Sequence, residues 1–442
     1  MNLYRGLKML RVMLLWSFIW CVLGAQENIQ SLIDAAKKHY PLHKNAALLQ
    51  NALSLNLSSL NTRYIARTKF ASKVSYQSDV VTLPFNTAAL SGMGLHLDGY
   101  TPLSKDQYAF TLEISQPLLD MGISASKKMA LAQYESQKSE LEVSLYQVSK
   151  AVINVYFQAL LLDSQIKQNA LHIMDLEKNY DNIQAQYKNG VLQRDALTKM
   201  RIQIISAQKN DELLRTQKAI ALDSLSALSG VDSIILESSG LQMPDIELQK
   251  QYLTQADTKD FMLRPEMMYF SLKNKEIATR QSVENAKNLP HIDAFLQLGY
   301  ANPSLNILSG KFEPYYIAGV RLNWDFSNFY TLRTERELIQ NARLQLDSKK
   351  EEFMLQTAIT RNEMIKSAHN LLAQLRENAR IITLYEDILR TQEARLKNGI
   401  LSINDFITDI NNLNLALLQQ KYIEIEFLLQ IFSLKQLHNV WE

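Results

Sequence analysis

The apolar residues of this chain recur with the period of a helix over long stretches. Between Leu141 and Ile166, within a helical pattern from about Ile123 to Lys188, they are spaced by alternating steps of four and three positions. Such steps place side chains on one stripe of a helix, and a stripe kept over several heptads is typical of a coiled coil. The stripe consists of Leu141, Leu145, Val148, Val152, Val155, Ala159, Leu162 and Ile166. We therefore expect one helix of about 66 residues, on the order of 100 Å long at about 1.5 Å per residue.

A second helix of similar length is expected to end at Lys397, followed by a shorter apolar helix. From Ser327 to Glu442 the chain contains no proline and a single glycine, Gly399. The shorter helix carries a stripe made of Leu415, Leu418, Tyr422, Ile425, Leu429 and Phe432. Gly (13) and Pro (9) are scarce in the whole chain, together about 5% against about 12% in average proteins. Because both residues interrupt helices, their scarcity favours a mainly α-helical fold with a small β part.

Four short segments follow the two-residue period of a β-strand instead. The clearest is 108–115, in which aromatic and aliphatic residues alternate with polar ones, and Gln116-Pro117 is expected to end it. Similar alternation marks residues 69–76, 292–300 and 316–323. One face of each strand is apolar. The opposite faces carry the charged residues Lys69, Lys73, Glu113, Asp293 and Arg321.

The order of these elements occurs twice. The motif from Tyr187 to Leu192 is nearly repeated 209 positions later, from Leu396 to Leu401. We therefore divide the chain, after a leader at 1–25, into a first repeat at 26–230, a linking segment at 231–260 and a second repeat at 261–442. Each repeat has the order helix, strand, loop, strand, long helix, tip and returning helix. The expected fold is a pair of long helical hairpins with four strands per chain.

Each copy of the repeated motif is expected to be a sharp turn between two helices. Gly190 and Gly399 directly follow helical runs, and glycine adopts the left-handed conformation that ends a helix without a Cβ clash. At the second tip, Ser402 and Asp405 have the spacing of a capping box. In that motif the serine hydroxyl accepts a first-turn N–H and the carboxylate reaches back.

Residues 1–25 have the features of a secretory signal peptide. Three basic residues precede an apolar run that is too short to span a membrane, and small residues at its end offer a cleavage site. The only cysteine, Cys21, lies in this segment, so cleavage would leave a chain without disulfides. It would also leave 44 basic and 45 acidic residues, and a near-neutral chain has no electrostatic footprint for nucleic acid. We expect an exported protein that helices do not hold in a bilayer.

The lengths of the strands suit a membrane. Each has about 8 to 10 residues, close to the about 9–11 that cross a bilayer as a tilted strand. Aromatic residues gather near the strand ends, as in interfacial belts. They are Tyr76, Tyr108, Tyr300, Tyr315, Tyr316, Trp324 and Phe326. Four strands cannot close a barrel, and an open edge in lipid would leave backbone groups unpaired, so several chains would have to share one barrel. Three chains would give twelve strands, wide enough for an aqueous pore. The alternative is a small soluble sheet with one solvated face.

The whole arrangement resembles the TolC-like outer-membrane efflux proteins of Gram-negative bacteria. The resemblance rests on the duplicated order of elements, on the Gln116-Pro117-Leu118-Leu119-Asp120 junction and on the two Lys-Asn-Gly tips. It implies a homotrimer with a twelve-stranded barrel in outer-membrane lipid, with the five charged strand residues in its lumen. It also implies a coiled-coil tunnel that crosses the periplasm to an adaptor (membrane fusion) protein and an inner-membrane pump. The expected function is export of small molecules such as drugs and toxic compounds.

By this resemblance, the tips contact the adaptor and form the periplasmic gate. The tip residues are Lys188, Asn189, Gly190, Val191, Leu192, Lys397, Asn398, Gly399, Ile400, Leu401 and Ser402. The family pattern has Ser or Thr three residues after the glycine and an acid six residues after it. Ser402 and Asp405 fit this pattern at the second tip. The first tip departs from it, because its acid, Asp195, stands five residues after Gly190.

Asp195, Asp405 and Asp409 are the candidate gate residues. Asp405 and Asp409 lie at i and i+4, where like charges repel. In a trimer, three copies near the axis would make an acidic ring that favours cations. The alternative is that Asp405 only caps its helix and that Asp409 is a solvated surface acid.

The chain shows no motif of an enzyme, a cofactor site or a metal site. Its seven histidines lack the His-Glu-x-x-His spacing, no Gly-rich phosphate loop precedes a helix, and no serine stands in a Gly-x-Ser-x-Gly turn. Two alternatives to efflux stay open. One is the outer-membrane component of type I protein secretion, which has the same architecture. The other is a soluble periplasmic coiled-coil scaffold, although an adaptor would need more β structure than this chain offers.

Overall fold

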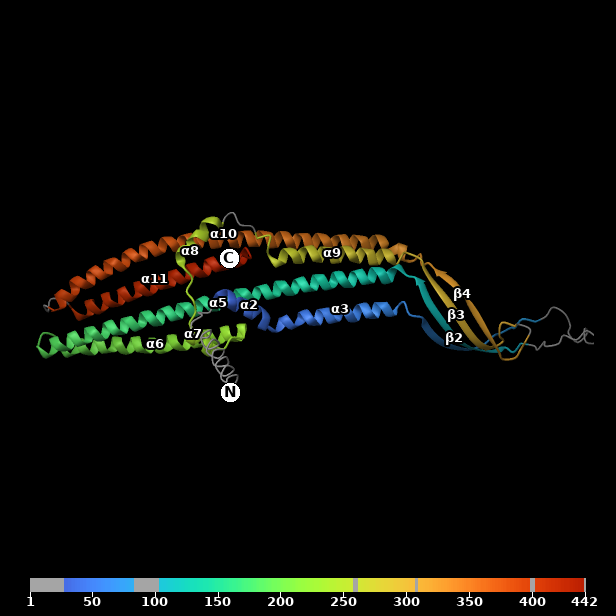
Figure 1. Ribbon diagram of the computed structural model, residues 1–442, viewed down its shortest axis with the longest axis horizontal. Coiled ribbons are helices and arrows are strands. Elements are labelled where there is room, and N and C mark those ends of the chain that lie inside the picture. The colour runs from blue at the N-terminus through green and yellow to red at the C-terminus, as the bar shows by residue number, and fades with distance from the viewer. Residues whose placement is uncertain (1–27, 83–102, 257–260, 307–308, 398–401, 441–442) are drawn as a thin grey trace, which may run out of the picture. The chain divides into compact units, whose positions relative to one another are not determined.

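The computed structural model describes residues 28–82, 103–256, 261–306, 309–397 and 402–440, so the expected signal segment lies outside the described residues. Figure 1 shows the elements in chain order. The helices are α2 (Ile29–His39), η1 (Pro41–His43), α3 (Lys44–Thr62), α5 (Met121–Lys188), α6 (Arg194–Ser229), α7 (Ser233–Ser239), α8 (Ile246–Gln255), α9 (Pro265–Ala286), α10 (Asn328–Lys397) and α11 (Ile403–Leu437). The strands are β1 (Arg67–Tyr76), β2 (Asp106–Leu119), β3 (His291–Asn302) and β4 (Glu313–Asn323). The expected mainly helical fold with a small sheet is confirmed.

The chain forms two compact units, each assembled from separate segments. Unit 1 comprises Met1–Ala46, Ser139–Tyr269 and Lys349–Glu442. Unit 2 comprises Ala47–Lys138 and Phe270–Ser348. Each unit contains segments from both predicted repeats, so the boundaries of the compact units differ from the boundaries of the sequence repeats.

Unit 2 contains one antiparallel sheet with the strand order β1-β2-β3-β4. The register places Phe70 opposite Leu112, Leu112 opposite Leu298, and Leu298 opposite Tyr316, which makes one face of the sheet apolar. Neighbouring residues in a strand point to opposite faces, so the register also fixes a polar face. The alternation predicted for the four strands is confirmed.

Strand β2 is longer than the sequence indicated. The prediction that Gln116-Pro117 ends it is wrong, because β2 continues to Leu119. The pairing with β3 shifts between Pro117 and Leu119. Proline lacks the N–H that a regular ladder requires, and an irregular position such as this one tolerates it.

Two aromatic rings lie directly over glycines on the polar face. A Cβ at Gly299 would lie 2.2 Å from Cζ of Tyr315, and a Cβ at Gly319 would lie 3.2 Å from Cε1 of Phe295. Each glycine is the cross-strand partner of the ring that covers it. The rings can therefore lie flat on β3 and β4 only because these positions have no side chain.

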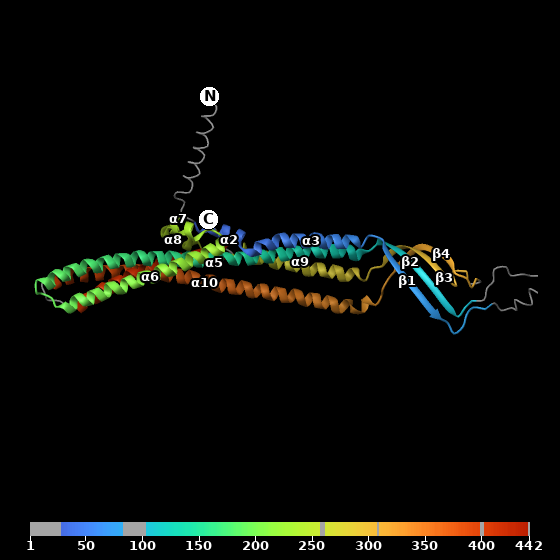
Figure 2. The ribbon, with the colours of Figure 1, turned by 90° about the horizontal axis from the view of Figure 1, so that it is seen from below.

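Unit 1 contains the two helical hairpins, and Figures 1 and 2 show α5 beside α6 and α10 beside α11. Its core includes Val152, Ile153 and Phe157 of α5 together with Phe427 and Leu428 of α11. Seven of the eight residues in the predicted α5 stripe are buried, and Val155 is half-buried. The coiled-coil prediction for this helix is confirmed as a packed seam.

The stripe predicted for α11 is partly wrong. Leu415 and Tyr422 are 62% and 43% exposed, although Ile425 and Phe432 are buried. The fully buried face lies mainly on neighbouring positions, namely Ala416, Ile423, Phe427, Leu428, Ile431 and Leu434. Helix α11 is apolar over most of its circumference, and a spacing rule cannot select one stripe when adjacent stripes are equally apolar.

A buried asparagine links the two helices of each hairpin at the same repeat position. Asn169 Nδ2 of α5 donates to the carbonyl oxygen of Ala207 in α6 at 2.9 Å. Asn378 Nδ2 of α10 donates to the carbonyl oxygen of Ala416 in α11, also at 2.9 Å. Both pairs differ by the repeat offset of 209. Because a buried amide needs its partner, each bond fixes the register of its hairpin.

The segment predicted as a loose link between repeats contains the short helices α7 and α8. Asp232 and Asp245 cap them, each accepting a first-turn N–H. With 7 and 10 residues they are too short to show a helical period in sequence. Among the described residues no single helix is apolar and long enough to cross a membrane, and one bent pair, α6 with α7, passes by length and composition.

The burial of Val152 predicts that Val152→Asp destabilises unit 1. Its side chain is fully buried in the core, and an unpaired carboxylate there should cost about 3 kcal/mol or more. The yield of folded protein and its thermal midpoint measure this loss. Ala170→Asp, at an exposed position of the same helix, is the control and should behave as wild type. A wild-type midpoint for Val152→Asp would remove this residue from the core.

Candidate functional site

The first hairpin tip is a glycine-terminated helix end. Helix α5 stops at Lys188, and Gly190 has a φ of 74°. The Val191 N–H donates to the Gln186 carbonyl at 2.9 Å, and the Gly190 N–H donates to the Tyr187 carbonyl at 3.0 Å. This pair of bonds is the Schellman motif, which satisfies helix-end carbonyls and needs a left-handed residue. The role predicted for Gly190 is confirmed.

The exposed surface of this tip is formed by Lys188, Asn189, Gly190 and Val191, whereas Leu192 is half-buried. Asp195 lies in the first turn of α6, after the N-cap residue Gln193. Its carboxylate is exposed and pairs with Lys199 one turn later, with 3.1 Å between Nζ and Oδ2. Exposed pairs of this type contribute little stability, so Asp195 is available to other partners.

The second tip is described only at its edges. Asn398, Gly399, Ile400 and Leu401 lie outside the described residues, and Lys397 is the last residue of α10. Ser402 is the N-cap of α11, and its Oγ accepts the Asn404 N–H at 3.3 Å. The serine half of the predicted capping box is thus confirmed. Between the described residues, no bond joins the Asp405 carboxylate to the Ser402 amide, so the reciprocal half is not formed.

Asp405 and Asp409 lie one turn apart on α11 in different surroundings. Asp405 is exposed, whereas Asp409 is half-buried and accepts a hydrogen bond from Gln392 Nε2 of α10. At the offset of 209, the first hairpin has Ile183 in place of Gln392 and Met200 in place of Asp409. Both of these apolar residues are fully buried. The two hairpins thus differ at one interhelical contact, which is apolar in the first and polar in the second.

One hydrophobic cluster joins the two hairpins near their tips. It includes Ile183 and Met200 of the first hairpin and Leu396, Phe406 and Ile410 of the second. Asn411 Nδ2 of α11 also donates to Gln203 Oε1 of α6 at 3.3 Å. The acidic residues therefore stand on adjacent hairpins. Within the described part of the chain, however, no hydrogen bond or ion pair connects Asp195 with Asp405 or Asp409.

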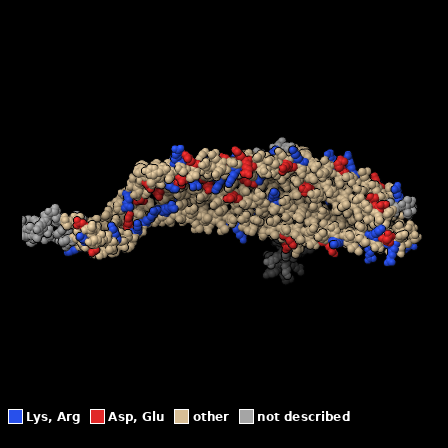
Figure 3. All heavy atoms as spheres, turned by 180° about the vertical axis from the view of Figure 1, so that it is seen from behind, with Lys and Arg blue, Asp and Glu red and all other residues tan. Residues whose placement is uncertain are grey.

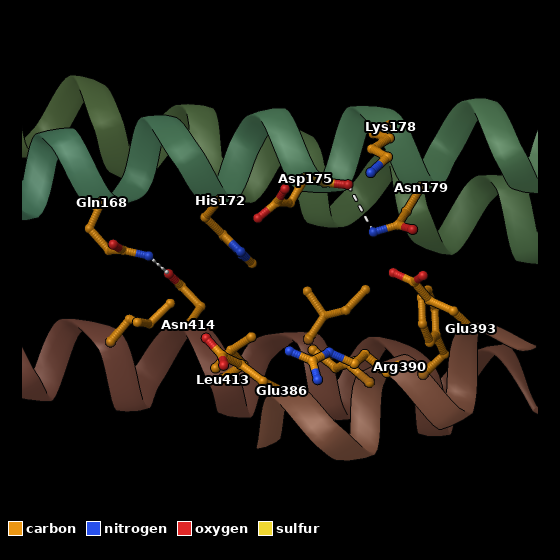
Figure 4. A pocket seen from close by; sticks show the side chains of 14 residues that line it. Gln168, His172, Asp175, Lys178, Asn179, Glu386, Arg390, Glu393, Leu413 and Asn414 are labelled. Carbon is orange, nitrogen blue, oxygen red and sulfur yellow. Dashed lines mark hydrogen bonds between the residues drawn. The ribbon is translucent and has the colours of Figure 1, made fainter. Parts of the chain in front are cut away.

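A groove of about 330 Å³ lies between α5 on one side and α10 and α11 on the other. Figure 4 shows His172 pointing from α5 into this groove, with Asp175 beside it. His172 is 8% exposed. Burial lowers the pKa of His172 below its usual value, and the Asp175 carboxylate opposes this shift. The other charged residues that line the groove are Lys178, Glu386, Arg390 and Glu393.

The five charged strand residues predicted to line a lumen share the polar face of the sheet. Arg321 Nη2 of β4 pairs with Glu113 Oε1 of β2 at 3.1 Å, and its guanidinium lies 4.5 Å from the centre of the Phe295 ring on β3. Asp293 is the cross-strand partner of Arg321. Lys69 is likewise opposite Glu113, and Lys73 lies four residues further along β1. Arg321 and Glu113 thus form an ion pair across the sheet, on a charged face that also carries Lys69, Lys73 and Asp293.

The asparagines Asn169 and Asn378 and the groove histidine were missed by the sequence reasoning. Asn169 stands at the next step of the α5 stripe after Ile166, so a polar residue in a seam was the available signal. No comparable signal marks His172, because its groove is formed by two hairpins far apart in sequence. Among the described residues, no group of three or more His, Cys, Asp or Glu could hold a metal ion.

Residues 74–231 match the family model described as outer membrane efflux protein. No curated protein matches the chain significantly. A membrane protein from Pseudomonas aeruginosa has a TM-score of 0.66 at 14% identity, covering 93% of this chain and 90% of that one. For the Campylobacter jejuni outer membrane channel CmeC the TM-score is 0.62 at 12% identity, with 93% and 85% covered. For the Neisseria gonorrhoeae outer membrane channel MtrE it is 0.62 at 13% identity, with 93% and 89% covered.

Residues 74–231 are therefore similar to the outer membrane efflux protein family. The resemblance to TolC-like channels is confirmed by this match and by the shared fold. The matched segment includes β2 with Glu113, all of α5, the first tip and Asp195. The likeness to the solved channels extends beyond this segment, because each match covers more than 90% of the chain.

The buried His172 predicts a pH dependence of the stability of the hairpins. Because burial lowers its folded-state pKa, the neutral ring contributes stability that is complete above the ordinary pKa of about 6.5. That stability should fall as the pH drops through 6.5 towards the lowered value. Denaturant unfolding at pH 7.5 and 5.0 measures it, and His172→Gln should reduce the difference. His369→Gln, at an exposed position of α10, should leave the difference unchanged. Equal pH responses in all three proteins would contradict a role for His172.

Proposed function

We propose that this protein is a trimeric outer-membrane channel-tunnel that exports small molecules from the periplasm or from a tripartite pump. The observation that carries the proposal is the sheet of unit 2, which has one apolar exposed face, one charged face and two open edges. The similarity of residues 74–231 to outer membrane efflux proteins and the fold shared with outer membrane channels support this proposal.

The apolar face of the sheet favours lipid as its surroundings. Phe70 and Tyr316 are 67% and 73% exposed, and Val74, Tyr76 and Val320 are exposed to a similar degree. A soluble protein rarely leaves such a contiguous apolar surface in water. This surface argues against the alternative of a soluble periplasmic scaffold, in which the same residues would face solvent.

The two open edges favour assembly. β1 and β4 each have a neighbour on one side only. In lipid, unpaired N–H and C=O groups cost several kcal/mol each, so each edge needs another strand. Pairing β4 of one copy with β1 of the next closes a ring, and three copies give twelve strands. Twelve strands leave an aqueous interior, which the ion pair of Glu113 and Arg321 would face.

The hairpin tips are the proposed contact with the adaptor and the proposed gate. Lys188, Asn189 and Val191 are exposed, as a docking surface requires. Asp405 is exposed, and Asp409 is held by Gln392 at the same end of α11. In a trimer, three copies of these carboxylates would surround the tunnel axis, with Asp195 on the neighbouring hairpin. A channel for type I protein secretion would have the same geometry, so the geometry does not identify the exported cargo. The choice of small molecules as cargo rests on the family match alone.

Native mass measured on protein extracted from the outer-membrane fraction tests the shared barrel. We expect a trimer that resists dissociation in detergent, because four strands per chain close only by assembly. Fractionation of whole cells gives the second reading, with the protein in the outer membrane. A monomer recovered from the soluble periplasm would overturn the channel and leave the scaffold interpretation.

Single-channel recording on Asp405→Asn and Asp409→Asn tests the gate. Both substitutions keep the shape of the side chain, and the amide oxygen introduced by Asp409→Asn can still accept from Gln392, so the charge alone is removed. We expect lower cation selectivity and weaker block by multivalent cations, because fewer carboxylates would line the ring. Asp223→Asn, at an exposed position of α6 away from the tip, is the control. Conductance and cation block equal to wild type in both variants would sink the gate assignment.

A further inference from the structure

We propose that a pocket between α9 and α10 binds the phosphate of an anionic phospholipid headgroup from the inner leaflet of the outer membrane. This proposal rests on the membrane location proposed above. The pocket lies entirely within unit 2 and has a volume of about 460 Å³. Three arginines of α10 line it, Arg333, Arg336 and Arg343, together with Gln281 of α9. The single acid among its lining residues is Glu337.

The charge of the pocket is positive and only partly compensated. Arg333 Nε pairs with Glu337 Oε1 at 3.0 Å, so these two residues largely neutralise each other. Arg336 Nη2 donates to Asn285 Oδ1 at 3.3 Å, and this amide carries no charge. Arg343 Nε is buried and has no hydrogen-bond partner among the described residues. The lining therefore presents two guanidinium groups without a carboxylate, one of them with an unused buried donor.

An unused buried guanidinium donor indicates an acceptor that is absent from the isolated chain. A buried donor without an acceptor is costly, and the planar guanidinium suits the paired oxygens of phosphate or carboxylate. Arg336 and Arg343 lie seven residues apart, which is about two helical turns, on one side of α10. Helical side chains lean towards the N-terminus of their helix, so Arg343 reaches back towards Arg336 and the start of α10.

The surroundings identify the source of this phosphate as a membrane lipid. Exposed aromatic residues lie between the end of β4 and the pocket. They are Trp324, Phe326, Phe329 and Tyr330, the last of which is 86% exposed. Trp324 packs against Phe326, which stacks on Phe329, and Phe329 itself lines the pocket. Aromatic residues of this kind concentrate at the level of lipid headgroups.

The aromatic cluster is anchored to the same two helices as the pocket. Trp324 Nε1 donates to the carbonyl oxygen of Asn288 at 3.1 Å, just beyond α9. On the face drawn in Figure 3, Lys and Arg atoms lie among Asp and Glu atoms where the helices of unit 2 adjoin the sheet. Acyl chains could follow the apolar face of the sheet while the phosphate enters the pocket. A free phosphate ion would explain the arginines but would leave the adjoining aromatic surface without a role.

Native mass spectrometry of the full-length assembly in detergent tests the proposal. Phosphatidylglycerol is the probe, and dioleoylglycerol and inorganic phosphate are the comparison ligands. We expect phosphatidylglycerol adducts on the wild type and an about tenfold weaker occupancy for Arg336→Gln/Arg343→Gln. Arg343→Lys keeps the positive charge but loses the planar guanidinium group with its several donors, so its phosphatidylglycerol occupancy should lie between those of the wild type and the double variant. Arg201→Gln, an exposed arginine of α6, is the matched control and should bind as wild type.

Three outcomes of this experiment would overturn the proposal. Equal phosphatidylglycerol occupancy in the double variant would remove these arginines from lipid binding. If dioleoylglycerol, which has no phosphate, bound as well as phosphatidylglycerol, the site would recognise only the apolar part of the lipid. If inorganic phosphate displaced the lipid and itself stayed bound, the pocket would be a site for a free anion. The oligomeric mass and the thermal midpoint of each variant are read on the same sample. A failure of the trimer or of folding is therefore seen separately from a failure of lipid binding.

Discussion

The sheet of unit 2 leaves the backbone of two strands unpaired, and most of the proposed biology depends on that constraint. N–H and C=O groups along the outer sides of β1 and β4 need partners. Water could supply them, but the adjoining face of the sheet is apolar and exposed, which disfavours water. Only further strands satisfy both requirements at once. The proposed assembly of several copies in lipid therefore rests on the apolar face and the open edges together, and either feature alone would not support it.

The hairpins of unit 1 meet a different requirement, which is to keep long helices in one register. An apolar seam such as that of α5 holds two helices together but allows them to slide by a turn at modest cost. Asn169 and Asn378 remove this freedom, because a slide would leave a buried amide and a buried carbonyl without partners. The same bond at the same repeat position in both hairpins supports a duplicated origin of the two halves more directly than the tip motifs do.

The sequence was sufficient wherever a local rule decides the structure. Helix α5, the tip at Gly190 and the alternation of the strands depend on period and on glycine geometry, and all three were predicted. Strand β2 runs past Pro117 because pairing with β3 outweighs the proline at an irregular position. The buried face of α11 and the groove around His172 depend on which helices pack together, and one sequence does not contain that information. The same holds for the candidate site. Its residues were predicted from motifs, but the residues that they contact, such as Gln392, were not.

The differences between the repeats indicate where a duplicated fold acquires function. Some equivalent positions keep their character, as the buried asparagines Asn169 and Asn378 do. At the tips the second hairpin replaces Ile183 and Met200 by Gln392 and Asp409, and Ala196 by Asp405. Gln392 and Asp409 form a polar contact where the first hairpin has an apolar one, and Asp405 is exposed where Ala196 is buried, so packing does not explain these replacements. A hydrogen-bonded pair can exchange its partner for water at little net cost, whereas an apolar pair cannot. The interhelical contact that is polar only in the second hairpin therefore includes Asp409, one of the residues proposed for the gate.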